Sequence, residues 1–234
     1  MNLAKYIDHT NLSPSASESD IRLLCAEARE HEFAAVCVNP IWVKLASDLL
    51  RGSDVKVCTV IGFPTGAHMP EVKLKEAELA LANGAEELDT VINITALKAS
   101  DIQTLQDDIA PLADAAHAAG AMLKVILETA LLNDEEIIRA CELCWKFGAD
   151  YVKTSTGMLP SKGTENNGAA THAVTLMHRH RRGKSTVGDP MGVKASGGIR
   201  DRKTALAMIE AGATRLGTSS GTAILTDSTS SNTY

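Results

Sequence analysis

The sequence has no long apolar run, no excess of positive charge and no stretch typical of a secretion signal. The first absence excludes a membrane-spanning helix, which needs roughly 20 consecutive apolar residues. Lysine and arginine total 23 against 29 aspartate and glutamate, a formal net charge of −6, so nothing favours a nucleic acid as partner. We therefore expect no membrane or nucleic-acid partner. Without a secretion signal, we expect a cytoplasmic protein.

Cysteines are few, and their number, five, is odd. An odd number without a secretion signal indicates reduced thiols rather than a disulfide framework. Cys141 and Cys144 have CxxC spacing, but they lie inside a helical pattern with no second pair and no histidines at zinc spacing. We therefore expect no metal and no cofactor, and no effect of EDTA on activity.

The sequence does contain a recurring junction, in which an amphipathic helix ends in Gly-Ala and a strand pattern follows at once. It occurs at Gly84-Ala85, Gly120-Ala121, Gly148-Ala149 and Gly212-Ala213. A glycine there takes the left-handed conformation that closes a helix. An eight-unit barrel of this length would average roughly 29 residues per unit, which suits the spacing of the junctions.

Eight segments are candidate strands, and several are continuous apolar runs, as strands buried on both faces require. Because strand and helix patterns alternate, the sheet should be parallel. An open doubly wound sheet would also alternate, but no Gly-x-Gly-x-x-Gly follows the first strand, which weakens its dinucleotide-binding version. The candidate strands are 6–10, 34–38, 55–61, 86–93, 122–128, 150–155, 191–196 and 214–218.

We predict an α/β fold, a (β/α)₈ TIM barrel that forms a single domain over residues 1–225 and has a short N-terminal segment. The polar residues 226–234 should form a flexible tail. Pro111 should break or kink the helix that begins near Asp101.

Charged residues interrupt the apolar strand patterns. Asp89, Lys153 and Lys194 lie within candidate strands, and Lys124 and Glu128 flank another. A lone buried charge is costly, so such residues are paired, shifted in pKa or functional. The carboxyl ends of barrel strands point into the active-site mouth. Taken singly, Lys124 and Glu128 are better explained as strand-end charges that reach solvent.

Lys153 and Lys194 stand near the ends of the sixth and seventh candidate strands, which are neighbours in a barrel. Two close ammonium groups repel each other, so one of them loses its proton more readily. A neutral amine is what attack on a carbonyl requires. The alternative is that both lysines only pair with a phosphate group.

Glycine and hydroxyl clusters follow the last two candidate strands, at Gly197-Gly198 and at 217–221. Barrels often bind phosphate between these two loops, where backbone N–H groups are accessible. Glycine lets the backbone approach the anion, and serine donates a hydrogen bond. The alternative is a pair of ordinary tight turns.

Eight stretches together resemble the deoxyribose-phosphate aldolases, in order from about residue 6 to residue 225. The most specific are Lys153-Thr-Ser-Thr-Gly157 and Lys194-Ala-Ser-Gly-Gly198. Thr95 stands where a glycine is expected, and the segment 158–190 is long and unusual. The remaining stretches begin at Ile7, Val36, Val60, Leu88, Leu123 and Gly217.

The resemblance implies a metal-free class I aldolase. It would reversibly cleave 2-deoxy-D-ribose 5-phosphate into D-glyceraldehyde 3-phosphate and acetaldehyde, in deoxyribonucleotide catabolism. By position, Lys153 would form the Schiff base, Lys194 would perturb the amine of Lys153, and Asp89 would handle protons. The resemblance also implies substrate-binding residues, namely Asp8, Cys37 and Lys124 along the site and Gly157, Gly197, Gly198, Ser219 and Ser220 around the phosphate.

The partner implied is a small phosphorylated sugar, and a homodimer is compatible with the resemblance. Two other functions remain open. One is a Schiff-base aldolase or lyase for another phosphorylated sugar. The other is a phosphate-binding barrel without catalysis, in which the two lysines only hold an anion.

Overall fold

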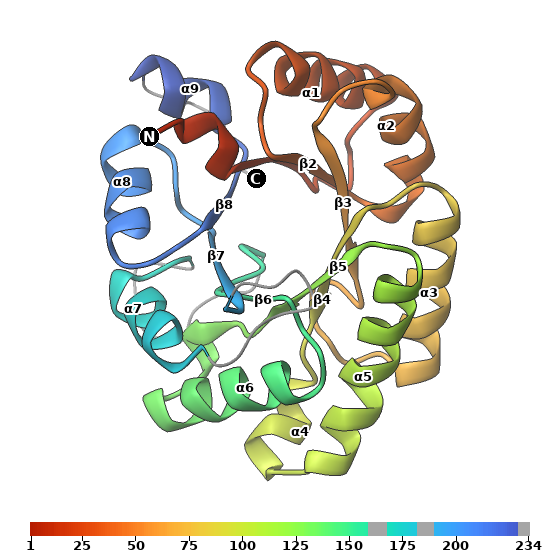
Figure 1. Ribbon diagram of the computed structural model, residues 1–234, viewed down its shortest axis with the longest axis vertical. Helices are drawn as coiled ribbons and strands as arrows, with labels where there is room; N and C mark the ends of the chain where they lie inside the picture. The colour runs from red at the N-terminus through yellow and green to blue at the C-terminus, as the bar shows by residue number, and fades with distance from the viewer. Residues whose placement is uncertain (159–167, 182–189, 229–234) are drawn as a thin grey trace.

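A computed structural model describes residues 1–158, 168–181 and 190–228. In it, eight parallel strands form a closed barrel in sequence order, and helices surround it (Figure 1). The predicted TIM barrel is confirmed, and each strand lies within its predicted range or one residue beyond it. The strands are β1 (Ile7–Asn11), β2 (Ala35–Val38), β3 (Lys56–Ile61), β4 (Glu87–Val91), β5 (Met122–Ile126), β6 (Tyr151–Lys153), β7 (Gly192–Ser196) and β8 (Arg215–Thr218).

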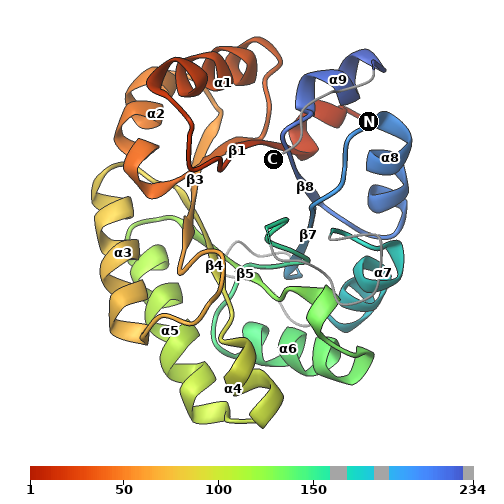
Figure 2. The same ribbon diagram turned by 180° about the vertical axis from the view of Figure 1, so that it is seen from behind.

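The helices pack around the outside of the barrel, and Figure 2 shows this ring from behind. The α-helices are α1 (Glu18–Glu30), α2 (Val43–Leu50), α3 (Pro70–Ala82), α4 (Ile94–Ala99), α5 (Ile102–Ala118), α6 (Asp134–Lys146), α7 (Thr171–His180), α8 (Arg202–Glu210) and α9 (Gly221–Thr226). The described residues also form three short 3₁₀ helices, η1 (Leu3–Tyr6), η2 (Pro40–Trp42) and η3 (Thr129–Leu131). Among the described residues, no helix is both long and apolar enough to cross a membrane.

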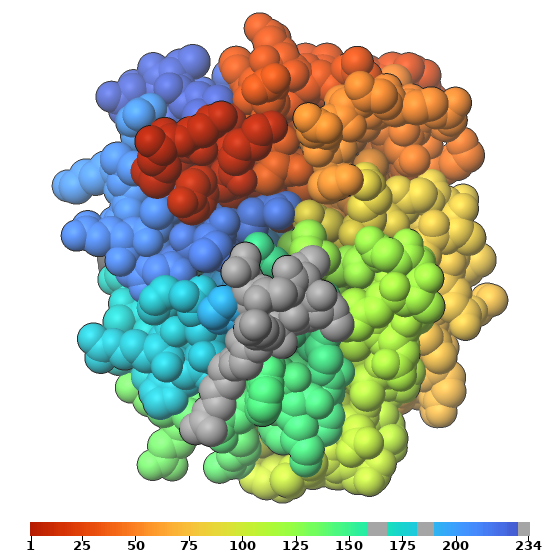
Figure 3. All heavy atoms as spheres, in the orientation of Figure 1, coloured from red at the N-terminus to blue at the C-terminus, as the bar shows by residue number. Residues whose placement is uncertain are grey.

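The two ends of the described chain meet. Strand β1 pairs with β8, and α9 packs against η1. Figure 3 shows the segments following one another around the surface, so that the first (red) and last (blue) lie side by side. The predicted tail over 226–234 is described only as far as Ser228; its remainder, with Tyr234, lies outside the described residues, and the domain boundary stays a prediction.

The Gly-Ala junctions close the helices as the sequence predicts. Gly148 and Gly212 have φ angles of 92° and 111°, in the left-handed region. The alanine that follows Gly148 donates its backbone N–H to Cys144 O at 2.9 Å, which satisfies a carbonyl of the last turn of α6. Pro111 lies inside α5, which continues from Ile102 to Ala118, so the predicted break is wrong.

The strands separate two hydrophobic regions. The larger lies between the barrel and its helices and takes outward-facing residues such as Val36, Leu88 and Val125. The smaller lies inside the barrel and consists of Leu12, Ala35, Cys37, Cys58 and Val60. It fills only part of the interior, and charged side chains occupy much of the rest.

One ion pair is buried outside the barrel. Lys73 on α3 and Asp108 on α5 have fully buried side chains, 2.7 Å apart between Nζ and Oδ1. Lys73 also donates to Val91 O at 2.7 Å, and Asp108 accepts from Asn93 N at 3.2 Å. Burial lowers the pKa of Lys73 and raises that of Asp108, although each partner's charge opposes the change. The pair anchors two helices to the end of β4.

Asp108→Ala is expected to lower the free energy of unfolding by about 3–5 kcal/mol, because it leaves the Lys73 ammonium group buried without its carboxylate. Lys73→Met combined with Asp108→Leu should recover much of this loss, since both charges are then absent. Urea denaturation followed by circular dichroism measures both values. Asp48→Ala breaks an exposed pair with Lys44 and serves as the control. A loss as small as that of Asp48→Ala would show that the buried pair contributes little.

Candidate active site

Within the described part of the chain, seven charged side chains point into the barrel from six strands. TIM-barrel interiors are usually filled with valine, isoleucine and leucine, so this interior departs from the common pattern. Every one of the seven residues is buried. They are Asp8 on β1, Glu87 and Asp89 on β4, Lys124 on β5, Lys153 on β6, Lys194 on β7 and Arg215 on β8.

Asp89 is the centre of this cluster. Its Oδ2 accepts hydrogen bonds from Lys153 Nζ at 2.7 Å and Lys194 Nζ at 2.8 Å. Its Oδ1 accepts from Lys124 Nζ at 2.9 Å and Cys58 Sγ at 3.1 Å. Burial raises the pKa of Asp89, but the three lysines lower it by more, so it lies well below its ordinary value. Asp89 is therefore a carboxylate in the resting site.

The other two carboxylates hold the remaining cations. Glu87 accepts from Lys124 at 2.6 Å and from Arg215 at 2.8 Å. Asp8 accepts from Arg215 Nε at 2.7 Å and forms an ion pair with Lys194. Burial raises the pKa of Asp8, but Arg215 and Lys194 lower it by more. The network thus connects opposite sides of the barrel.

Lys194 is held as a cation. Burial lowers the pKa of Lys194, but the negative charges of Asp8 and Asp89 raise it by a larger amount. The pKa of Lys194 therefore lies above its ordinary value. Lys194 therefore keeps a positive charge, and it lies beside Lys153 because the Nζ atoms of both residues contact the same oxygen of Asp89.

The charges of the cluster do not balance if every group is ionised. Three lysines and one arginine face three carboxylates among the described residues of the interior. The side chain of Lys153 is 4% exposed, against 0% for Lys124 and 1% for Lys194, and its one ion-pair partner here is Asp89. Lys153 is therefore the least enclosed of the three lysines and has fewer carboxylate partners than Lys124 or Lys194, which makes it the candidate for the amine that reacts.

Lys124 and Glu128 do not reach solvent, so that explanation of them is wrong. Lys124 is fully buried in the cluster. Glu128 is 1% exposed, and its Oε2 accepts from Thr156 N at 3.0 Å and Thr156 Oγ1 at 2.5 Å. Burial raises the pKa of Glu128. Glu128 thereby ties the end of β5 to the loop after Lys153.

The predicted phosphate residues lie on loops that the structure brings together. A Cβ added to Gly157 would lie 3.7 Å from the Cα of Gly197. Gly198 has a φ of 74° and open space where a Cβ would be. The loop after β8 joins the loop after β7 through Thr218, whose Oγ1 donates to Ile199 O at 2.6 Å and accepts from Ser220 N at 2.9 Å. Residues 159–167 and 182–189, within the unusual segment 158–190, lie outside the described residues.

Sequence reasoning missed three members of the cluster. Glu87 precedes Asp89 by two positions, and strand alternation puts both side chains on one face, so this signal was available. Arg215 is a charge within the candidate strand 214–218, the same signal as Lys153, but its partner Glu87 lies far away in the sequence. Cys58 is an uncharged residue in an apolar strand, and its contact with Asp89 had no signal in the sequence.

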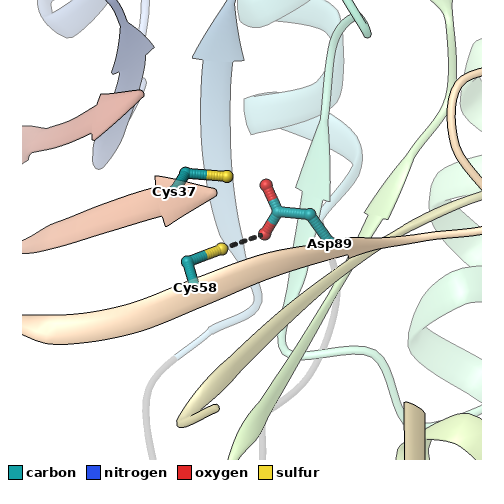
Figure 4. A group of neighbouring side chains, drawn as sticks. All are labelled: Cys37, Cys58 and Asp89. Atoms are coloured by element: carbon teal, nitrogen blue, oxygen red, sulfur yellow. Dashed lines mark hydrogen bonds between the residues drawn. The ribbon is translucent and has the colours of Figure 1, made fainter. Parts of the chain in front are cut away.

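Cys37 and Cys58 lie beside Asp89 inside the barrel (Figure 4). The two sulfur atoms and an Asp89 oxygen lie within 4.8 Å of one another, a spacing that metal ligands also have. A second group with the same spacing consists of ligand atoms from Asp8, Cys58 and Glu87. However, the oxygens of these carboxylates already accept bonds from lysine and arginine. Neighbouring cations disfavour a divalent metal there, and the absence of a metal requirement remains a prediction.

A family model described as DeoC/LacD family aldolase matches residues 2–227. The chain belongs to this family. As a DeoC/LacD family aldolase it is a carbon–carbon lyase, which confirms the class of enzyme that the sequence predicts.

Full-length relatives agree with this assignment. This aldolase is 55% identical over 226 residues to the deoxyribose-phosphate aldolase of Brevibacillus brevis, covering 97% of this chain and 96% of that one. It is 52% identical over 223 residues to the deoxyribose-phosphate aldolase of Aciduliprofundum boonei, covering 95% of each. The predicted family resemblance is therefore confirmed.

A solved structure supports the fold of this aldolase. The deoxyribose phosphate aldolase of Aeropyrum pernix, described as tetrameric, superimposes with a TM-score of 0.83 at 37% identity. The superposition covers 96% of this chain and 89% of that one. Both chains therefore share the closed barrel.

Proposed function

We propose that this chain is a class I aldolase that reversibly cleaves 2-deoxy-D-ribose 5-phosphate into D-glyceraldehyde 3-phosphate and acetaldehyde, in deoxyribonucleotide catabolism. The observation that carries the proposal is the position of Lys153, against Asp89 and beside Lys194, in an interior where four basic side chains face three carboxylates. The names of the full-length relatives support this substrate.

The reaction follows from the chemistry of an amine and an aldehyde. Neutral Lys153 attacks C1 of the open-chain sugar, and loss of water gives a protonated imine. The C3 hydroxyl loses its proton, the bond between C2 and C3 breaks, and its electrons move into the imine to form an enamine. Glyceraldehyde 3-phosphate leaves. Protonation of the enamine at C2 and hydrolysis release acetaldehyde and restore the amine.

In this proposal, two charged residues support Lys153. Lys194 stays a cation beside the Lys153 amine, the position at which the family resemblance implies a residue that perturbs this amine. Asp89 orients both amines through one oxygen. As a carboxylate, Asp89 would accept a hydrogen bond from a water molecule that takes up the C3 proton. Asp8, Cys37 and Lys124 complete the wall around these groups.

The phosphate group would lie at the meeting point of three loops, those after β6, β7 and β8. Two neighbouring glycines there, Gly197 and Gly198, have positive φ angles, and Gly198 is exposed, a backbone arrangement that suits an anion-binding turn. Gly157 approaches them from the loop after β6. Ser219 and Ser220 follow β8 and provide hydroxyl groups.

Gly198→Ala is expected to raise KM for deoxyribose 5-phosphate by about tenfold, because a methyl group would block one charge-assisted hydrogen bond to the phosphate. Cleavage of unphosphorylated deoxyribose should change much less. Gly120→Ala is a matched control, since Gly120 also has a positive φ and open space but lies at the α5–β5 junction. Steady-state kinetics of both variants provide the comparison. Equal changes in KM would place the phosphate elsewhere.

A coupled assay for glyceraldehyde 3-phosphate released from deoxyribose 5-phosphate tests the substrate. We expect sustained turnover. Borohydride trapping on Lys153 without this turnover would indicate an aldolase for another phosphorylated sugar. Neither turnover nor trapping would indicate a phosphate-binding barrel without catalysis.

Cytoplasmic location and a homodimer belong to the same proposal. The five cysteines are buried free thiols, which supports a reducing compartment. Self-association is supported by the tetrameric relative, and light scattering coupled to gel filtration measures the number of subunits.

A further inference from the structure

Two thiols face each other inside the barrel. Cys37 on β2 and Cys58 on β3 are paired in the register of these adjacent parallel strands. Both residues are fully buried. Their sulfur atoms lie within 4.8 Å of each other and of an Asp89 oxygen. Figure 4 shows both sulfur atoms pointing to the same side, toward Asp89.

This arrangement suits a disulfide bond. Neighbouring strands lie about 4.8 Å apart, and the Cα atoms of disulfide-bonded cysteines are usually about 4.4–6.8 Å apart. The other three cysteines, Cys25, Cys141 and Cys144, lie on helices in the outer core. Among the cysteines, only Cys37 and Cys58 share the interior with the candidate active site.

We propose that Cys37 and Cys58 are a site of reversible oxidation, at which hydrogen peroxide joins them in a disulfide and switches off the aldolase. Formation of the bond does not depend on the proposed function. The loss of activity rests on that function, because the pair contacts Asp89, the partner of Lys153.

The chemistry takes two steps. The Cys37 thiolate attacks one oxygen of hydrogen peroxide, forming a sulfenic acid as the O–O bond breaks and hydroxide leaves. The Cys58 sulfur then attacks the sulfenic sulfur, the S–S bond forms, and the S–O bond breaks. The thiol protons accompany the two oxygens, so two thiols and one peroxide give one disulfide and two waters. A dithiol such as dithiothreitol reverses the oxidation by forming its own disulfide.

The surroundings give the two thiols different roles. A hydrogen bond with Cys58 lowers the pKa of Cys37 by more than burial raises it, and the charge of Lys194 lowers it further, against the opposite effect of Asp89. Burial and the Asp89 carboxylate raise the pKa of Cys58. Cys37 is therefore the thiol that peroxide oxidises first, and Cys58 is the one that closes the bond.

Oxidation would alter the centre of the ion cluster. Cys58 donates a hydrogen bond to Asp89 Oδ1 at 3.1 Å and accepts one from Lys124 at 3.4 Å. A disulfide has no thiol hydrogen, so Asp89 loses one of its four donors. The carboxylate that orients Lys153 is then held differently, and we expect kcat/KM to fall by about tenfold or more.

Peptide mapping of the peroxide-treated wild-type enzyme under non-reducing conditions tests the bond itself. The expected result is a linked pair of peptides that contain Cys37 and Cys58. Deoxyribose 5-phosphate cleavage should fall as the linked pair appears and return with dithiothreitol. Absence of the linked pair would reject the site, and full activity of the linked enzyme would reject the switch. An untreated enzyme without this cleavage would instead reject the proposed function, whatever the mapping shows.

Two variants distinguish the Cys37–Cys58 pair from the other thiols. The activity of each peroxide-treated variant is compared with the activity of the same variant before treatment. In Cys58→Ala, Cys37 has no partner and should progress to sulfinic acid, so dithiothreitol should not restore the lost activity. Cys144→Ala removes a thiol of the outer core and should keep the reversible loss. Recovery in Cys58→Ala equal to that of Cys144→Ala would contradict the pairing. The wild-type mapping decides the question if either variant fails to fold.

Discussion

Lys153→Arg and Lys153→Met are both expected to lower kcat for deoxyribose 5-phosphate by roughly 10⁴-fold or more, because neither side chain can form an imine. Arginine keeps the positive charge, whereas methionine removes it and leaves three cations facing three carboxylates. Lys153→Met should therefore fold at least as stably as the wild type. The coupled assay and urea denaturation give the two values.

The pair of variants also distinguishes catalysis from simple charge pairing. If Lys153 only held a phosphate, arginine would replace it well, since its guanidinium group binds phosphate through two donors. Substantial activity in Lys153→Arg would thus contradict a Schiff base at this residue. Loss of activity in Lys153→Arg, together with unchanged binding of inorganic phosphate, would support a Schiff base at Lys153.

Asp89→Asn is expected to reduce both activity and stability. The amide has no charge, so three lysines and one arginine face only Asp8 and Glu87, and the free energy of unfolding should fall by about 3–5 kcal/mol. Activity per folded molecule should fall by about 10²–10⁴-fold, because Lys153 loses the anion that orients it and the water that takes up the C3 proton loses its carboxylate partner.

A second buried carboxylate offers the control for Asp89→Asn. Asp108→Asn makes the same chemical change in a fully buried ion pair outside the barrel. It should lower stability yet retain most of the activity per folded molecule. Kinetics at a temperature where both variants are folded, as judged by circular dichroism, make the comparison valid. Equal activity losses would mean that Asp89 acts through stability alone.

Much of the fold could be predicted because it depends on local signals. The Gly-Ala junctions identify helix ends through a backbone conformation that glycine favours, and the structure shows Gly148 and Gly212 in it. The break predicted at Pro111 is wrong because the loss of one helical hydrogen bond at a proline does not end α5, which continues to Ala118.

The site was predictable only in part, for a physical reason. Lysines in apolar strands pointed to an active site, but their partners depend on which strands neighbour each other across the barrel. Arg215 reaches Asp8 and Glu87, which lie far away in the sequence. Without those partners Lys124 seemed to be a solvent-exposed strand end. The structure instead buries it against two carboxylates.

The central claim is that Lys153 forms the imine. Sodium borohydride added with acetaldehyde reduces an imine to a stable secondary amine, and peptide mapping by mass spectrometry then locates the added ethyl group. We predict the ethyl group on Lys153, in proportion to the activity lost, and none in Lys153→Met. An ethyl group on Lys194 would reverse the assignment of the two lysines, and no modified lysine in an inactivated enzyme would contradict the Schiff-base mechanism itself.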